Sequence, residues 1–301
     1  MITLEELEQD RIKLKNKTLL IVGIVGGIVA ILALIFQTIE IVFFGIMAML
    51  LFPALFTAKQ KREYILKFKK HFVHSSLQTV FTHLNYKPEQ GMPRSDISQT
   101  QMMYMGDRYT SNDYISGKYK DIGFRQADVH IEEERESTDS DGNTTTYWVT
   151  IFKGRWMIFD FNKTFKADLQ VCQKFFGNNK INNWGKENKF QKVKLESMEF
   201  NKRFNTFAQS DHEAFYLLTP QIMEKIIKLD DMNQGRLLLC FIDNKLHIGL
   251  YDGKDSFEHA PIFKQINEEQ VRNNISNDIK QITMFIDELD LDNDLFRREA
   301  K

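Results

Sequence analysis

Residues 18–57 read TLLIVGIVGGIVAILALIF, QTIE and IVFFGIMAMLLFPALFT, which are two apolar runs with four residues between them. Neither run, 18–36 or 41–57, contains a charged side chain. Each approaches the ~20 residues that a helix needs to cross ~30 Å of hydrocarbon. The connection at 37–40 is so short that the second helix must turn back beside the first. We therefore predict a transmembrane helical hairpin over residues 18–57.

Basic residues flank the hairpin on one side only. Residues 1–17 carry Arg11, Lys13, Lys15 and Lys17, and the connection at 37–40 carries no Lys or Arg. After the second run come Lys59, Lys61, Arg62, Lys67, Lys69 and Lys70. Loops rich in Lys and Arg stay on the cytoplasmic side of a membrane. This bias predicts a plasma-membrane protein with both termini in the cytoplasm.

The first apolar run also contains small residues four positions apart. They are Gly23 with Gly27 and Gly26 with Ala30. Such a strip lets another helix approach closely. Two interpretations follow: the strip packs against the second helix near Gly45 and Ala48, or it packs against a second copy of the chain.

A basic amphipathic helix is predicted over residues 58–86, directly after the hairpin. Its apolar residues recur at steps of three and four: Ile65, Phe68, Phe72, Val73, Leu77, Val80, Phe81 and Leu84. The six basic residues between 59 and 70 predict contact with anionic lipid head groups. The alternative is that they serve only as the topology signal. His71, His74 and His83 predict no metal site, because no Cys or carboxylate completes a ligand set.

The remaining residues, 87–292, are predicted to form a cytoplasmic α+β domain. Beyond residue 57 the Lys+Arg and Asp+Glu counts are both 36, which argues against a nucleic-acid partner. Cys172 and Cys240 are the only cysteines and lie far apart, as reduced thiols in the cytoplasm would. A loop is expected near 177–188, and residues 293–301 are expected to be a C-terminal tail.

Strand and hairpin patterns predict a largely antiparallel sheet. One hairpin is expected at 144–152 and 155–161 with its turn at Lys153-Gly154, and another at 237–242 and 246–251 with its turn at Asp243-Asn244. Further strands are expected at 122–132, 167–174, 193–200 and 204–209. Helices are expected after Ser210, over 221–229 after Thr219-Pro220, and over 267–289 at the C-terminal end. A seven-stranded, partly closed barrel like a pleckstrin-homology domain is one version of this pattern.

Candidate chemistry is sparse. The acidic runs that begin at Asp139 and Asp290 lack the Gly and Glu that a calcium loop requires, and no phosphate loop or nucleophile elbow occurs. A turn at Asp243-Asn244 places Cys240 opposite His247, where a thiol faces an imidazole. These two residues are weak catalytic candidates, and a small buried thiol beside a structural histidine is the alternative. No cofactor and no metal are predicted.

Several motifs resemble the bacterial family known as domain of unknown function 3137. They are SQTQ at 98–101, DYISGKY at 113–119, IFKGRW at 151–156, DFNKTF at 160–165, LESMEF at 195–200 and AFYLLTP at 214–220. The similarity runs over roughly residues 95–260, with the membrane hairpin where members commonly have it. The resemblance implies a membrane-anchored bacterial protein and assigns no catalytic residue.

The favoured function is therefore a membrane-anchored binding or scaffolding module, which contacts anionic lipid or a protein partner at the inner membrane face. One alternative is an enzyme whose site is assembled from scattered residues, such as Cys240 with His247 or the acids Glu196 and Glu199. A second is an accessory subunit of a membrane complex that uses the small-residue strip.

Overall fold

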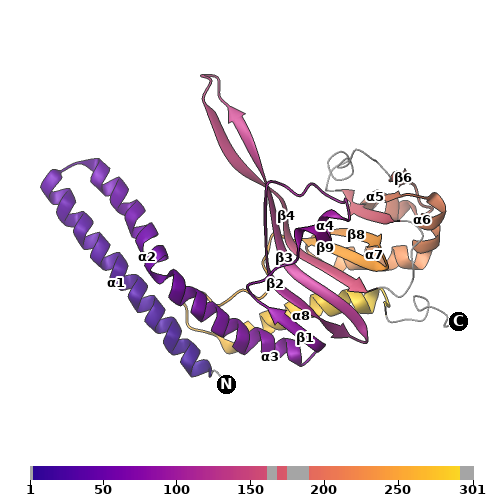
Figure 1. Ribbon diagram of the computed structural model, residues 1–301, viewed down its shortest axis with the longest axis horizontal. Helices are drawn as coiled ribbons and strands as arrows, with labels where there is room; N and C mark the ends of the chain where they lie inside the picture. Colours follow the sequence, from indigo (N-terminus) through magenta and orange to yellow (C-terminus); the bar gives the residue numbers. More distant parts are fainter. Residues whose placement is uncertain (1–2, 161–167, 175–189, 292–301) are drawn as a thin grey trace. The chain divides into compact units, whose positions relative to one another are not determined.

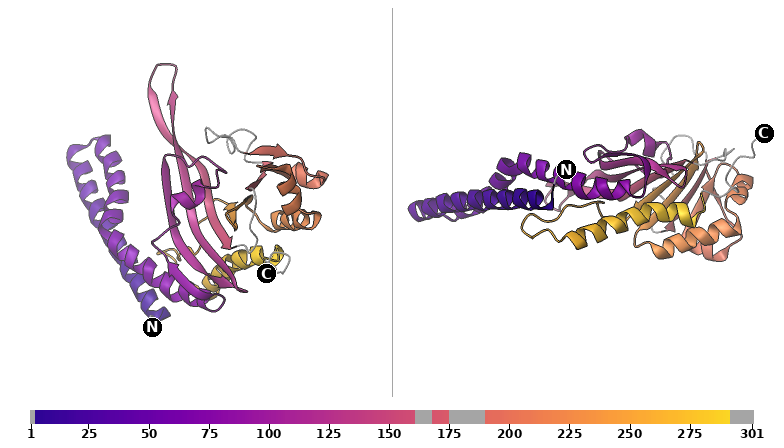
Figure 2. Two further views of the ribbon diagram at one scale, coloured as in Figure 1. Left: turned by 45° about the vertical axis from the view of Figure 1, so that its right-hand side comes forward. Right: turned by 90° about the horizontal axis from the view of Figure 1, so that it is seen from below.

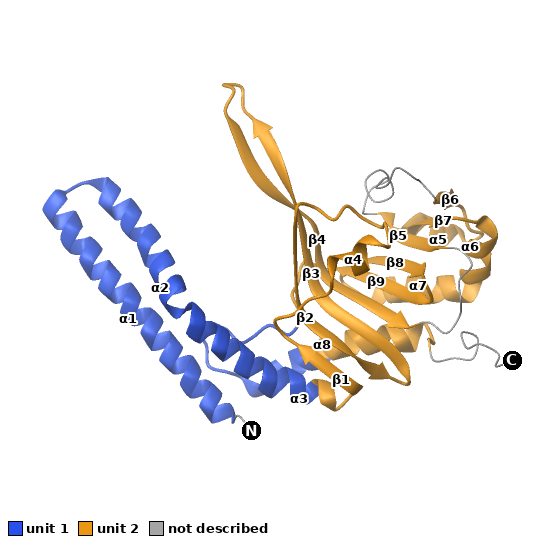
Figure 3. Cartoon of the chain, viewed as in Figure 1, with its two compact units in different colours: residues 1–76, 257–276 blue, residues 77–256, 277–301 orange. Residues whose placement is uncertain are grey.

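The chain divides into two compact units in the computed structural model, which describes residues 3–160, 168–174 and 190–291 (Figures 1 and 3). Unit 1 comprises residues 1–76 and 257–276, and unit 2 comprises residues 77–256 and 277–301. The expected loop at 177–188 and the expected tail at 293–301 lie outside the described residues.

Unit 1 is built on two long antiparallel helices, α1 (Leu4–Phe36) and α2 (Ile39–Phe68), which lie side by side (Figures 1 and 2). A capping box starts α1: the Thr3 hydroxyl accepts a hydrogen bond from the Glu6 amide, and the Glu6 carboxylate accepts one from the Thr3 amide. Gln37 ends α1 in the left-handed conformation. Only two residues then separate the helices. On the side away from this turn, both helices extend well beyond the apolar runs.

The helix predicted over 58–86 ends earlier than expected. It is the continuation of α2, followed by one π-helical segment, η1 (Lys69–His74), and by α3 (Ser75–Gln78). Residues Thr82–Lys87 form strand β1 instead. Their backbone groups pair with the neighbouring strand, for example Asn85 with Ser116. This long-range pairing overrides the local helical spacing, and the prediction was wrong for these residues.

Unit 2 contains a nine-stranded sheet within the described residues, and every neighbouring pair is antiparallel. Its strands are β1, β2 (Arg108–Tyr119), β3 (Ile122–Thr138), β4 (Thr144–Asp160), β5 (Leu169–Gln173), β6 (Gln191–Val193), β7 (Phe204–Ala208), β8 (Arg236–Ile242) and β9 (Lys245–Tyr251). The spatial order is β1-β2-β3-β4-β9-β8-β5-β7-β6. The α+β class is confirmed. The seven-stranded, pleckstrin-homology-like barrel is wrong, because β1 and β6 remain separate edges.

In the described part of the chain, five helices accompany the sheet: α4 (Arg94–Ser98), α5 (Met198–Arg203), α6 (Asp211–Leu217), α7 (Pro220–Met232) and α8 (Glu268–Glu288). The starts predicted at Ser210 and Thr219 are confirmed, as is the C-terminal helix. The strand predicted over 193–200 is wrong. The Ser197 hydroxyl accepts a hydrogen bond from the Phe200 amide and thereby starts α5 inside that range.

The hairpin predicted around Lys153-Gly154 is also wrong, because β4 runs unbroken through these residues. Its partner is β3, and the turn lies at 139–143, where the Asp139 carboxylate accepts hydrogen bonds from the Asp141 and Asn143 amides. The ends of β3 and β4 nearest this turn project beyond the rest of the sheet (Figure 1). Gly154 serves a different purpose: a Cβ there would stand 2.1 Å from the Leu250 carbonyl oxygen of β9. Glycine therefore marks a close approach of strands.

The second predicted hairpin is confirmed as β8 and β9. Ile242 pairs with Lys245, and both turn residues, Asp243 and Asn244, have positive φ angles of 49° and 59°. Two consecutive residues with positive φ form the type of two-residue turn that matches the twist of paired strands.

Both faces of the central strands are covered. On one face, Trp156, Ile158 and Leu238 pack in a cluster with the methionines of the segment between β1 and β2, namely Met92, Met102, Met103 and Met105. On the other face lies α8 (Figure 2). There the Arg155 guanidinium donates to the Asp278 carboxylate at 2.8 Å, and the Phe159 and Phe285 rings lie 6.5 Å apart. Burial on both faces explains why β4 is a continuous apolar run from Trp156 to Phe159.

Replacing Gly154 by alanine is expected to cost roughly 3 kcal/mol of the free energy of unfolding, because the new Cβ collides with β9. Gly142 is the matched control: its φ is also positive, at 85°, but a Cβ there meets no atom within 4 Å. Gly142→Ala should therefore cost only about 1 kcal/mol. Guanidinium unfolding of the full chain in detergent, followed by tryptophan fluorescence, measures both losses. Equal losses would contradict the predicted collision between a Cβ at residue 154 and β9.

Candidate functional site

The apolar parts of α1 and α2 present their side chains outward. Leu34, Ile39 and Leu55 are 78%, 86% and 72% exposed. In the most apolar 18-residue stretch of α1 no residue is buried, and in that of α2 only 17% are buried. The two helices are long and apolar enough to cross a membrane, by length and composition.

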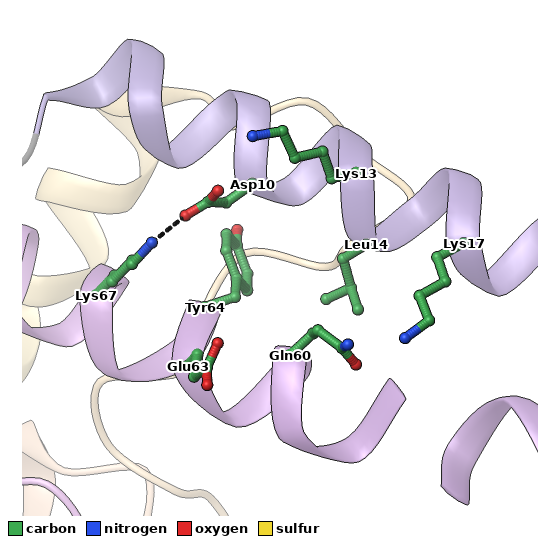
Figure 4. Close-up of a pocket in the computed structure, with 8 residues that line it drawn as sticks. All are labelled: Asp10, Lys13, Leu14, Lys17, Gln60, Glu63, Tyr64 and Lys67. Atoms are coloured by element: carbon green, nitrogen blue, oxygen red, sulfur yellow. Dashed lines mark hydrogen bonds and ion pairs between the residues drawn. The ribbon is translucent and has the colours of Figure 1, made fainter. Parts of the chain in front are cut away.

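A cavity of about 160 Å³ lies between the two helices, beyond the ends of these apolar stretches (Figure 4). It is lined by Asp10, Lys13, Leu14 and Lys17 of α1 and by Gln60, Glu63, Tyr64 and Lys67 of α2. Both sets follow the spacing i, i+3, i+4, i+7, which places each on one helix face. A water molecule occupies ~30 Å³ in the liquid, so the cavity has room for a small polar group with several oxygens.

Three lysines and two carboxylates line this cavity. The Lys67 ammonium and the Asp10 carboxylate form an ion pair at 2.5 Å across one end of it. Near the other end, the Lys17 ammonium donates to the Phe56 carbonyl oxygen at 3.2 Å. Since an ammonium carries three protons, Lys17 retains donors for another acceptor.

Tyr64 stands between the helices with its hydroxyl directed toward α1 (Figure 4). The side chain is only 2% exposed, and its hydroxyl has no hydrogen-bond partner among the described residues. Burial raises the pKa of Tyr64 to about 12, so the hydroxyl keeps its proton at neutral pH. A buried donor without an acceptor carries a desolvation cost of about 1–3 kcal/mol.

A distant segment of the chain, residues 257–276, packs on the same end of α1 and α2. Arg11 is 5% exposed, pairs with the Glu8 carboxylate at 2.6 Å and donates to the Ile262 carbonyl oxygen, also at 2.6 Å. The Ile266 amide donates in turn to Glu8. The hydrogen bond to Arg11 lowers the pKa of Glu8 and raises that of Arg11. These hydrogen bonds hold residues 262–266 against α1. In the same segment, the His259 ring lies 6.2 Å from the Tyr64 ring.

The six basic residues predicted to contact lipid lie along α2 and η1. Lys59, Lys61, Arg62, Lys67 and Lys70 are exposed, whereas Lys69 is buried. Of these, only Lys67 lines the cavity, and Lys13 and Lys17 join it there from α1. The charge pattern did not predict Lys13 and Lys17 as neighbours of α2, because it does not indicate which faces of the two helices meet. The shared i, i+3, i+4, i+7 spacing was the available signal.

The small residues of the first run divide between two faces. A Cβ on Gly26 would lie 3.7 Å from the Met49 sulfur of α2, so Gly26 faces the hairpin contact. A Cβ on Gly23 or Gly27 would meet nothing within 4 Å. The closest approach of the helices uses Gly45, where a Cβ would stand 2.2 Å from Val29. Ala30 is exposed.

Cys240 and His247 pair directly across β8 and β9, as the turn at Asp243-Asn244 predicts. Both are fully buried. The Cys240 thiol points to the Thr100 carbonyl oxygen at 3.9 Å, and the Trp156 indole donates to His247 Nδ1 at 3.3 Å. Burial raises the pKa of the Cys240 thiol well above its usual value and lowers the pKa of His247 to about 3. The pair therefore stays thiol and neutral imidazole at pH 7, and a thiolate nucleophile is not available from this geometry.

Two buried acids, which the sequence did not single out, lie in β2 and β3. Asp128 is 1% exposed and accepts two hydrogen bonds at 2.6 Å, from the Ser256 amide and the Ser256 hydroxyl. Asp113 accepts one from the Tyr86 hydroxyl at 2.6 Å. Burial raises the pKa of Asp128 to about 7, against the opposing effect of the Ser256 bonds. With both oxygens bonded inside the domain, Asp128 anchors the segment after β9.

Metal ligands do not converge in the described part of the chain: no group of three or more His, Cys, Asp or Glu side chains stands close enough to hold an ion. The Asp139 carboxylate is bonded to backbone and side-chain groups of its own turn.

Comparison with known proteins identifies a family for the C-terminal half. The family model "Protein of unknown function (DUF3137)" matches residues 150–291, from β4 past the end of α8. The family resemblance is thus confirmed. A search of curated proteins found no match. Among solved structures, the crystal structure of the mycobacterial trehalose monomycolate transport factor A, TtfA, is similar with a TM-score of 0.40 and 10% identity, over 75% of this chain and 95% of that chain. A likeness at this level does not bear on the activity of this chain.

Cys240 is expected to resist alkylation in the folded chain, because its thiol is buried and its pKa is raised. Iodoacetamide at pH 7.5 should modify neither Cys240 nor Cys172 until guanidinium unfolds the protein, as measured by mass spectrometry of peptides. Ser140→Cys, at the exposed turn between β3 and β4, provides a reactive control. Modification of Cys240 as fast as of the Ser140→Cys thiol would indicate an activated nucleophile.

Proposed function

We propose that this chain is a membrane-anchored binding module at the cytoplasmic face of a bacterial plasma membrane. In this proposal α1 and α2 cross the bilayer as a hairpin, and unit 2 lies in the cytoplasm. The basic residues that follow the apolar run of α2 then bind anionic lipid head groups. The observation that carries the proposal is the outward exposure of the apolar side chains of both helices.

The direction of insertion rests on charge. Four basic residues precede the first run, six follow the second by residue 70, and residues 37–40 between the two apolar runs contain Glu40 and no Lys or Arg. Moving the basic ends across the membrane would be the less favourable arrangement.

The lipid contact rests on the same residues after insertion. Lys59, Lys61 and Arg62 are exposed and follow Thr57, the last residue of the apolar run, within five positions. A basic residue this close to an anionic leaflet contributes ~1 kcal/mol of attraction, and the attraction falls off within a Debye length of ~8–10 Å. The contact is therefore strongest for the first two turns after the apolar run.

Vesicles test the topology. In inverted inner-membrane vesicles of a bacterial host, added protease should digest unit 2, and in intact spheroplasts unit 2 should be protected, because both ends of the hairpin face the cytoplasm. Antibodies against a tag after residue 301 follow the product. A periplasmic protein and a cytoplasmic protein of the host report on vesicle integrity. Digestion from outside the spheroplasts would overturn the assigned direction.

Hydrogen exchange tests the lipid contact. The full chain in nanodiscs that contain phosphatidylglycerol should exchange amide protons at residues 58–68 more slowly than in phosphatidylcholine nanodiscs, because bound head groups restrain this end of α2. The variant Lys59→Gln/Lys61→Gln/Arg62→Gln should lose most of that difference. The control Lys192→Gln/Lys194→Gln/Lys202→Gln removes the same charge from exposed positions of unit 2 and should keep it.

Two results would count against the lipid contact. Equal exchange in the two lipids would remove the basis for it. Slowing at residues 58–68 only after a protein from the host membrane is added would assign the basic residues to a protein partner.

A further inference from the structure

The cavity between α1 and α2 combines features that an anionic group needs. It lies directly beyond the apolar runs, since Lys17 is the residue before the first run and Gln60 comes three residues after the second. A head group at the cytoplasmic leaflet would stand at this depth when the hairpin spans the bilayer. The cavity is thus open to lipid phosphate groups at a fixed height.

The charges around the cavity are unevenly distributed along it. At the end farther from the apolar runs, Asp10 and Lys67 neutralise each other at 2.5 Å. Toward the apolar runs lies Lys17, which keeps free donor protons. The Lys13 side chain extends toward the Asp10 end (Figure 4) and makes no hydrogen bond or ion pair with another described residue. Glu63 is the one carboxylate of the lining outside the ion pair, so the lining carries two ammonium groups and one carboxylate beyond that pair. This excess of positive charge favours an anion in the cavity, with Lys17 as the ammonium group nearest the apolar runs.

Tyr64 supplies the independent observation. Its hydroxyl is a buried donor whose hydrogen bond is not made within the described residues, although it lines a polar cavity. Buried hydroxyls nearly always have a partner, so an orphaned one at a cavity indicates a missing acceptor. An oxygen of a bound anion is an acceptor of the required kind, and a hydrogen bond to a charged oxygen is about twice as strong as one between neutral groups.

We propose that this cavity binds the phosphate group of an anionic membrane lipid, with Lys13 and Lys17 neutralising its charge and the Tyr64 hydroxyl donating a hydrogen bond to one of its oxygens. The inference rests on the proposed function, because the hairpin must span the bilayer for lipid phosphate to reach this height. It adds a defined site, with one directed donor, to the diffuse attraction of the exposed lysines.

Native mass spectrometry of the full chain, released from a neutral detergent with added phosphatidylglycerol, tests the site. Tyr64→Phe removes one oxygen and no charge, and it should weaken retention of the first lipid about tenfold, as expected for loss of a hydrogen bond to a charged group. Lys13→Gln/Lys17→Gln should weaken it at least as much. Lys192→Gln/Lys194→Gln, at exposed positions of unit 2 that belong neither to the cavity nor to the proposed lipid contact, is the control and should change retention less than threefold. A thermal unfolding curve confirms that each variant is folded.

Three outcomes would overturn part of the proposal, and a fourth would support it. Equal retention by the wild type and Tyr64→Phe would overturn the site, while the exchange difference at residues 58–68 would still support the proposed function. Displacement of the lipid by inorganic phosphate at matched concentration would overturn the lipid assignment, because the site would then select soluble phosphate. Equal retention of phosphatidylcholine by the wild type would overturn the role of charge. Preference for phosphatidylglycerol that depends on Tyr64 would support the site.

Discussion

The uncovered apolar surface of α1 and α2 is the constraint on which the rest of the architecture depends. Within each helix the backbone groups bond to one another, so the helices need no partner for their peptide groups in an apolar medium. Their side chains are different: Leu34, Ile39 and Leu55 face outward, and no described residue of unit 1 covers them. In the proposed function the hydrocarbon of the bilayer surrounds these side chains. Charged residues accordingly appear only before residue 18 and after residue 57, apart from Glu40 in the first turn of α2.

Neither helix breaks where its apolar run ends. The contact between Gly45 and Val29 in the apolar part therefore continues into the polar part, where Leu7, Leu14 and Tyr64 are buried. Arg11 then fixes residues 262–266 to this bundle through hydrogen bonds to Glu8 and Ile262. A segment more than 240 positions away in sequence is thus held against the base of the hairpin. Each helix continues without a break from its apolar run to the cavity. In the proposed membrane orientation, the lengths of the apolar runs therefore set the depth of the cavity relative to the bilayer.

Sequence patterns predicted the elements whose signals are local. The β8–β9 hairpin depends on two adjacent turn residues, α7 on Thr219 and Pro220, and α8 on its own apolar stripe. The strand predicted over 193–200 failed because of a local cap at Ser197, whereas the other failures involve distant partners. Gly154 resembles a turn glycine, but glycine is required there because the backbone of β9 passes 2.1 Å from the position that a Cβ would occupy. Residues 82–87 continue a helical spacing of apolar side chains, yet they form β1 because their backbone groups pair with β2. Sheet order, and with it the distinction between an open sheet and a barrel, depends on such pairings.

The contrast between local signals and distant partners also applies to the basic residues at the proposed membrane surface, some of which are exposed and some of which line the cavity. Charge counting finds Lys59, Lys61 and Arg62, because an exposed cation needs no neighbour to attract an anionic surface. Finding Lys13 and Lys17 requires knowing that residues 10–17 of α1 face residues 60–67 of α2, and finding Tyr64 requires knowing that its hydroxyl is buried there. Exposed charges are screened by salt over a Debye length of ~8–10 Å, whereas charges beside a buried donor are screened much less. In the proposed function the diffuse attraction brings the lipid surface near, and in the proposed site the cavity provides the fixed geometry in which one phosphate group is distinguished from the others.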